Sequence, residues 1–257
     1  MSPHVKQLKY NNELSFEGVT NSVLAYLCLA VPGWEDICER VTLKPGTVIV
    51  HGGSRPTLVH FPINCVVVDL VSTLGDNLRH NEIQVAMHGR SDIVGCSALL
   101  STGLSSRRSV VDHGGQAVRC SVDAARRLLS ESPEGRAIVM DYAALAIDEC
   151  AQLAAGEVQL KVVERVAAHL VQLAGILEDT VIPVTHIRIG ERLGIRRPSV
   201  TESLQTLEAA GLISQADKGR VDIRDLEGLK KRVQLAWPML GHARQAFSER
   251  LTRVALG

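Results

Sequence analysis

Short apolar runs separated by turn residues fill the chain between about residues 41 and 122. The runs are short and either continuously apolar or alternating; they lie at residues 48–50, 57–61, 65–71, 83–87, 109–111 and 116–122. Turn pairs between them, such as Pro45-Gly46 and Gly114-Gly115, supply backbone conformations that β-branched residues do not adopt. Strands this short, at such regular spacing, predict an antiparallel sandwich or barrel.

The period becomes helical from about Pro133. Apolar residues then recur at three- and four-residue steps in two stripes, which predicts two amphipathic helices. The first stripe is Val139, Tyr142, Ala146, Cys150 and Leu153, and the second is Val158, Val162, Val166, Leu170, Leu173 and Leu177. Gly156 marks a bend or break between the two helices. Two interpretations stay open: both helices pack on their own chain, or the first pairs with its copy in a second chain.

A segment further along combines helix start and stop signals in a familiar order. Thr185 is placed to cap a helix that Gly194 ends, and Pro198 lies in the first turn of a second helix. A turn with basic residues at 217–220 and an alternating strand at 221–223 follow. The buried stripe of the second helix is Val200, Leu204 and Leu207. Helix, tight turn, helix and basic hairpin together predict a winged helix-turn-helix.

Basic residues gather around this motif. Between Val184 and Thr201 there are four arginines and one acid, Glu191; the arginines are Arg188, Arg192, Arg196 and Arg197. They place positive charge at the N-terminal end of the second helix, which is the end that enters the major groove in this motif. Arginine grips phosphate, or reads guanine, through two parallel hydrogen bonds. Formal net charge is zero, so affinity for DNA has to come from such local clustering.

The predicted DNA-binding residues come from the capping position, the second helix and the hairpin. They are Thr185, Arg196, Arg197, Ser199, Thr201, Glu202, Gln205, Lys218 and Arg220. Among them, Glu202 is a candidate acceptor for a cytosine amino group. The alternative is an ordinary solvated face, in which case the winged helix is a protein-interaction module without sequence-specific DNA binding.

The stretch LGIRRPSVTESLQTLEAAGLI, Leu193 to Ile213, resembles a family pattern. The pattern is the Leu-Gly-x-x-Arg-x-Ser/Thr-Val-x-Arg-x-Leu-x-x-Leu-x-x-x-Gly-Leu-Ile signature of the Crp/Fnr superfamily of transcription regulators. The segment from Lys218 to Leu229 is also similar to that family's wing and following helix, and Gly89 to Gly95 resembles part of a subgroup. The resemblance covers about residues 21–232.

The resemblance implies an α+β fold in three parts. Residues 1–130 are expected to form an antiparallel β-roll or jelly-roll domain related to cyclic-nucleotide-binding modules. Residues 131–156 are expected to form a dimerisation helix, and residues 157–257 a winged helix-turn-helix with a C-terminal tail whose role the sequence leaves open. The expected partners are a second copy of the chain, double-stranded DNA with a two-fold symmetric operator, and RNA polymerase if the protein is an activator.

Two departures from the family pattern change what is expected. Glu202 and Pro198 stand where the family commonly has an arginine and a base-reading acid, so a different operator is expected. The family's cyclic-nucleotide pocket uses a Gly-Glu pair for the ribose, and the glutamate is missing here. An unpaired buried hydroxyl costs about 1–3 kcal/mol, so cyclic-nucleotide binding is doubtful and no cofactor is predicted. The residues left as a possible effector pocket are Gly95, Ser97, Arg108 and Ser109.

Other function classes find little support in the sequence. No catalytic motif is present, so the protein is not expected to be an enzyme. The six cysteines form no CxxC pair, and no metal site is expected. No signal-peptide pattern and no run of about 18 apolar residues occurs, so a cytoplasmic protein without a membrane partner is expected. The sequence leaves open whether an effector acts, and whether the protein activates or represses.

Overall fold

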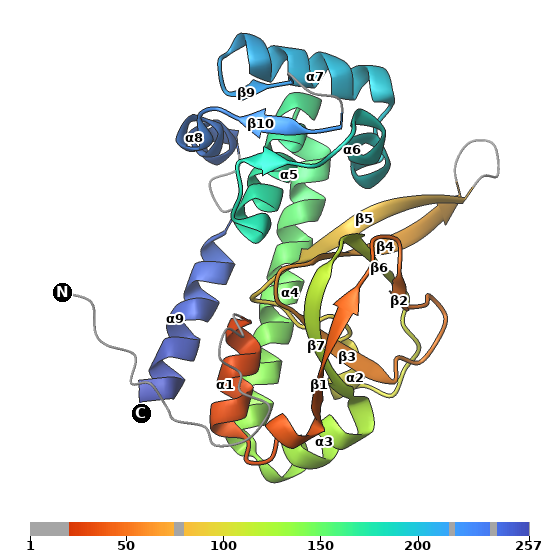
Figure 1. Ribbon diagram of the computed structural model, residues 1–257, viewed down its shortest axis with the longest axis vertical. Coiled ribbons are helices and arrows are strands. Elements are labelled where there is room, and N and C mark those ends of the chain that lie inside the picture. The colour runs from red at the N-terminus through yellow and green to blue at the C-terminus, as the bar shows by residue number, and fades with distance from the viewer. Residues whose placement is uncertain (1–20, 75–79, 216–218, 237–240, 257) are drawn as a thin grey trace.

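The computed structural model describes residues 21–74, 80–215, 219–236 and 241–256. Its architecture is α+β, as predicted, with two antiparallel sheets in the N-terminal half (Figure 1). The first sheet orders its strands as β1 (Cys38–Leu43), β7 (Gly115–Ser121) and β3 (Leu58–Pro62). The second orders β2 (Val48–Val50), β6 (Arg108–His113), β4 (Val66–Leu74) and β5 (His80–His88). The strands follow the apolar runs of the sequence, except for β1, which was not predicted.

The central strand β4 is covered on both faces. Val67 packs between the two sheets, whereas its neighbour Val66 belongs to the apolar core of the C-terminal half. Both side chains are fully buried. A strand buried on both faces reads as a continuous apolar run rather than an alternating one, and this explains the Val66-Val67-Val68 triplet.

Four short helical segments accompany the sheets in the described part of the N-terminal half. They are α1 (Ser22–Ala30), the 3₁₀ turn Glu35–Ile37, α2 (Ser97–Leu100) and α3 (Val122–Glu131). The sequence pattern does not predict α1, because Ser22–Ala30 is apolar almost all round and shows no periodic stripe. Asn21 caps α1 and its side-chain amide donates to the carbonyls of Pro62 and Asp92, which fixes the helix to the sheet domain.

The long helix α4 (Pro133–Gln159) begins as the sequence suggests, with Ser132 as its cap. The predicted break at Gly156 is wrong, since the helix continues to Gln159 and the chain turns extended at Leu160. Gly156 is buried inside the helix. The stripe that contains Val139 and Tyr142 faces its own chain, where both residues are buried in the N-terminal core. Of the two open interpretations, burial within one chain therefore holds for this stripe.

The winged domain follows in the expected order. It contains α5 (Val162–Leu177), β8 (Val181–Ile182), α6 (His186–Leu193), α7 (Arg197–Ala209), β9 (Ile213–Ser214), β10 (Val221–Ile223) and α8 (Leu226–Ala236). The three short strands form one sheet in the order β8-β10-β9. Apolar residues of α5, α6, α7 and α8 share a single core with this sheet.

The last helix, α9 (His242–Leu256), leaves the winged domain and returns to the N-terminal half (Figure 1). Phe247 and Leu251 are buried in the N-terminal core, and the Phe247 ring packs edge-on against Tyr142 at a centroid distance of 5.9 Å. The C-terminal tail therefore divides between the two halves: Val233 of α8 is buried in the winged-domain core, whereas α9 packs on the N-terminal half. No helix in the described ranges is long and apolar enough to cross a membrane.

Candidate nucleic-acid interface

The local geometry of α6 and its turn follows the sequence signals. The Thr185 side chain accepts a hydrogen bond from the Arg188 backbone N–H at 3.1 Å, which caps the helix. Gly194 ends α6 at a φ of 64°, in the left-handed region that favours glycine. Gly190 allows a close approach, since a Cβ atom there would lie 2.8 Å from the Ile195 carbonyl oxygen. These features turn the chain tightly from α6 into α7.

The second helix of the motif, α7, is buried along the predicted stripe. Val200, Leu204 and Leu207 are all fully buried, which confirms the prediction. Arg196, Arg197, Glu202 and Gln205 are exposed, and Ser199 and Thr201 are half-buried. The exposed guanidinium groups therefore lie at the N-terminal end of α7, where they are free to meet phosphates or base edges.

The wing is described in part. Arg220 is exposed just before β10, and its Nε lies 3.5 Å from Asp222 Oδ1. Lys218 lies outside the described residues. Thr185, the other predicted contact beyond α7, is exposed while its hydroxyl oxygen caps α6.

A polar network behind the α7 face was not found from the sequence. His186 Nδ1 lies 3.0 Å from Thr201 Oγ1, and His186 Nε2 lies 2.9 Å from Gln215 Oε1. Gln215 in turn donates from its backbone and side chain to Glu208, at 2.8 and 3.0 Å. His186 thus links the first turn of α6 to α7, the recognition helix of the motif, and to Gln215, which follows β9 at the start of the wing. The only sequence signal was a lone histidine next to a capping residue.

The other two arginines of the cluster, Arg188 and Arg192, contact an acid of the N-terminal sheet, although the Arg188 side chain is still 40% exposed. Arg192 is buried and donates through Nε to Asp112 Oδ1 of β6 at 3.0 Å. Arg188 Nε lies 3.5 Å from the same carboxylate oxygen. The sequence reading that grouped all four arginines at the DNA-facing end of α7 is therefore wrong for these two. They tie the winged domain to the N-terminal sheet.

Histidines complete this inner cluster. His113 lies with Nδ1 3.3 Å from Asp112 Oδ2 and with Nε2 3.1 Å from the Pro183 carbonyl oxygen. Burial alone would raise the pKa of Asp112, but the hydrogen bonds from His113 and Arg192, with their charges, hold it well below its usual range. His169 on α5 lies nearby, and burial lowers its pKa to about 4. Asp112 is thus a charged anchor at the junction of the two domains.

The possible effector residues predicted from sequence do not converge. Arg108 and Ser109 are neighbours on β6 and so face opposite sides of the sheet. The Arg108 guanidinium binds Glu82, with its Nε 2.6 Å from Oε1, whereas the buried Ser109 hydroxyl donates to Asp69. Gly95 has a positive φ of 83° and Ser97 is exposed on α2.

Comparison with known proteins also supports a DNA-binding role for the winged domain. Residues 164–232, from α5 to α8, match the family model of the Crp-like helix-turn-helix domain. FixK2 from Bradyrhizobium japonicum has a similar structure, with 14% identity, a TM-score of 0.62, and 76% of this chain and 96% of that chain covered. A Crp/Fnr-family transcriptional regulator from Thermus thermophilus shows 20% identity, a TM-score of 0.57, and coverage of 76% and 98%. No curated protein gives a significant match.

Residues 164–232 form a Crp-like helix-turn-helix domain, and the chain shares its fold with solved regulators of the Crp/Fnr family. The domain match and the exposed arginines of α7 support DNA binding by the winged domain. Another structure of the same fold is the c-di-GMP-responsive global regulator CLP of Xanthomonas campestris, at 17% identity, a TM-score of 0.58, and coverage of 80% and 98%. At these identities the likeness is one of fold.

Proposed function

We propose that this protein is a transcription regulator of the Crp/Fnr type that acts as a homodimer and binds a two-fold symmetric operator through α7 of each subunit. The observation that carries the proposal is an apolar stripe on α4 that is exposed among the residues that the structure describes. Its members are Ala137, Met140, Ala144, Ile147, Ala151, Ala154 and Val158, and all seven are exposed in the single chain. This set is named the α4 seam below.

The α4 seam has the spacing of a coiled coil. Its members follow one another at alternating steps of three and four residues, which is the 3.5-residue repeat that keeps two helices in contact. Alanines alternate with the larger Met140 and Ile147, so a partner helix can approach closely. Arg136 and Asp141 flank the seam at positions that face each other in a parallel pair. The stripe recognised from the sequence occupies the opposite, buried face of the helix.

A parallel pairing of α4 places the two winged domains on one side of the dimer. Two α7 helices related by a two-fold axis would read half-sites about one helical turn apart, roughly 34 Å. In this scheme the two N-terminal sheets bias the placement of the winged domain, because Asp112 of β6 contacts Arg188 and Arg192. A promoter where the protein activates would add RNA polymerase as a partner.

The seam is tested by a charge placed within it. Ile147→Asp should convert the dimer to a monomer, because two carboxylates would face each other in an apolar seam. Leu104→Asp is the matched control, since Leu104 is 68% exposed, Ile147 is 69% exposed, and Leu104 lies outside the seam. Sedimentation velocity gives the mass, and anisotropy on full-site and half-site duplexes gives the affinity.

The expected result is a monomeric Ile147→Asp protein whose affinity for the full site falls to that for a half-site, with the Leu104→Asp protein unchanged. A dimeric Ile147→Asp protein, or a wild-type monomer at micromolar concentration, would contradict the proposal.

A further inference from the structure

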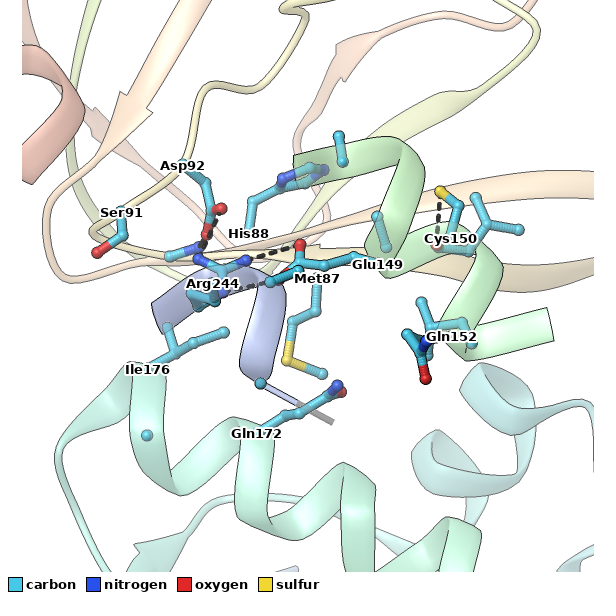
Figure 2. Close-up of a pocket in the computed structure, with 18 of the residues that line it drawn as sticks. Met87, His88, Ser91, Asp92, Glu149, Cys150, Gln152, Gln172, Ile176 and Arg244 are labelled. Atoms are coloured by element: carbon cyan, nitrogen blue, oxygen red, sulfur yellow. Dashed lines mark hydrogen bonds and ion pairs between the residues drawn. The ribbon is translucent and has the colours of Figure 1, made fainter. Parts of the chain in front are cut away.

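A cavity of about 360 Å3 lies at the junction of the two domains (Figure 2). Its walls come from the end of β5 with the following loop, from α4, from α5 and from the start of α9. None of the four residues predicted as a possible effector pocket lines it. The cavity therefore joins the sheet domain, the helix with the seam, the winged domain and the C-terminal helix in one place.

The wall is largely apolar. Met87 from β5, Leu153 from α4, and Val171 and Ile176 from α5 face the cavity together with several alanines. Cavities of this size and lining are the usual binding sites of small organic molecules. Water gains few hydrogen bonds against such a wall, so an apolar occupant is favoured.

The charged groups at the wall are already paired with one another. Arg244 of α9 donates through Nε and Nη2 to Glu149 of α4 at 2.8 and 2.9 Å, and through Nη1 to Asp92 at 3.0 Å. His88 Nε2 lies 3.2 Å from Asp69, and Arg107 lies 3.5 Å from the same carboxylate. Arg90, which also lines the cavity, pairs with Glu178. Because the cations at the wall already contact carboxylates, with His88 and Arg107 sharing Asp69, an anionic ligand would have to compete with these ion pairs.

A polar recess adjoins the apolar space. A second cavity of about 30 Å3 shares Leu153 and Gln172 with the first, and is also lined by His169 and Gln84. Within the described part of the chain, neither ring nitrogen of His169 nor Gln84 Oε1 has a hydrogen-bond partner. Such buried groups are normally satisfied. Burial lowers the pKa of His169 to about 4, and a neutral imidazole offers one donor and one acceptor, which suits an uncharged polar group.

We propose that this junction cavity binds a small, uncharged, mainly apolar organic molecule that carries one hydrogen-bonding group. The body of the molecule lies against Met87, Val171 and Ile176, and its polar group points toward Gln172 and the recess. Residues of α5 and of the loop after β5 both line the cavity, so any movement of α5 away from this loop changes the shape of the cavity. A bound molecule would therefore also influence where the winged domain sits. That coupling rests on the proposed function, whereas binding itself does not.

The close packing at this junction supports the coupling. Gly89, in the loop after β5, lies against α5 so tightly that a Cβ atom would be 2.5 Å from Ile176 Cγ2. Arg90 in the same loop forms an ion pair with Glu178 at the end of α5. Ile176 is thus the residue of α5 that packs against the loop after β5, and a ligand that contacts Ile176 touches this contact directly.

The proposal is tested with N-phenyl-1-naphthylamine, an uncharged aromatic probe with one N–H group that fluoresces in apolar surroundings. Its sulfonated analogue, 1-anilinonaphthalene-8-sulfonate, has the same body with a negative charge. Both are titrated into the full-length protein, with no DNA present. The structure predicts saturable binding of the uncharged probe, and binding of the sulfonate at least about tenfold weaker, because its charge would have to compete with the ion pairs at the wall.

A cavity-filling variant locates the binding. Gly175 on α5 lines the cavity, and a Cβ atom there would meet nothing within 4 Å, so Gly175→Leu adds a large side chain at the cavity wall from a position where a Cβ atom fits. Gly175→Ala is the matched control, which makes the same change in helix propensity while leaving the cavity open. Thermal unfolding of both variants checks that they are folded.

The expected result is loss of probe affinity by about tenfold or more in Gly175→Leu and near-wild-type affinity in Gly175→Ala. Equal probe binding in the two variants, or stronger binding of the sulfonate, would overturn the proposal. Probe binding that follows the prediction but leaves DNA affinity unchanged would overturn only the coupling. Failure of DNA binding with probe binding intact would count against the proposed function alone.

Discussion

Arg188 and Arg192 on α6, and Arg196 and Arg197 at the start of α7, lie within ten residues of one another, yet the two pairs differ in their contacts. The first two meet the buried carboxylate of Asp112, which β6 of the N-terminal sheet supplies. The second two are exposed at the tip of the recognition helix. In this molecule a buried acid in the neighbouring domain, and not the arginine-rich sequence itself, decides which arginines are available to DNA.

The two pairs of arginines therefore have different roles. The inner arginines set where the winged domain sits on the sheet domain, and the outer ones are left to contact DNA. An acid buried with two arginines and a histidine tolerates little change, since removing one partner of a buried ion pair leaves an uncompensated charge. An exposed arginine contributes little to folding. The two halves should therefore respond to mutation in different assays.

The largest expected effect comes from removing the shared carboxylate. Asp112→Ala leaves the Arg192 guanidinium buried without its partner, and we expect the free energy of unfolding to fall by about 3–5 kcal/mol. Urea denaturation at neutral pH measures it. Asp123→Ala, at an exposed aspartate in the first turn of α3, is the control and should cost no more than about 1 kcal/mol. A small loss for Asp112→Ala would show that the inner arginines do not need their acid.

We next predict a pH dependence of stability caused by His169, which is buried near Asp112. The pKa of His169 is lowered to about 4 by burial, so the folded protein binds fewer protons than the unfolded chain below about pH 6.5. The corresponding stability is present above pH 6.5 and is lost as the pH falls toward 4. Between pH 7 and pH 5, His169 should account for about 2 kcal/mol of lost unfolding free energy.

His169→Gln removes this contribution. His60, whose pKa burial also lowers to about 4, remains in the variant and keeps its own share of the dependence. Denaturation at pH 7 and pH 5 should therefore show a shallower, though not flat, dependence in the variant. If the variant lost as much unfolding free energy between pH 7 and pH 5 as the wild type, the pKa of His169 would not be lowered by burial, which would contradict the prediction.

The smallest expected effect tests the outer half through His186. His186→Ala removes the link between α6, Thr201 and Gln215, so α7 and the wing should be held less firmly. We expect DNA affinity to fall by about three- to tenfold, of the order of one hydrogen bond's free energy, with little change in the slope of affinity against salt. His186→Gln, which keeps a side chain able to donate and accept, should recover part of the affinity. If His186→Ala changed the slope of log affinity against log salt as much as the loss of an arginine does, His186 would contact DNA directly, which would contradict this role.

The parts of the fold that the sequence predicted depend on neighbours in the chain. The Thr185 cap, the Gly194 stop and the Val200, Leu204 and Leu207 stripe each follow from residues within one or two helical turns. The parts that it missed depend on distant partners. Arg192 and Asp112 are 80 residues apart, and Arg244 and Asp92 are 152 apart.

Helix α4 shows a second limit of sequence patterns. It carries apolar residues on two faces, and spacing alone did not separate the stripe through Val139 and Tyr142 from the one through Met140 and Ile147. Only the tertiary contacts show that the first is buried and the second exposed. The junction cavity was likewise unreadable, because its walls come from segments scattered between Val85 and Arg244.

The most direct test of the division between the two arginine pairs is fluorescence anisotropy on the DNA upstream of the gene, with salt titration. We predict that Arg197→Ala lowers affinity by about ten- to a hundredfold, and reduces the slope of log affinity against log salt by about one. Arg188→Ala should change both much less. Equal losses in the two variants, or binding by the wild type that does not depend on salt, would contradict the assignment of DNA contact to the start of α7.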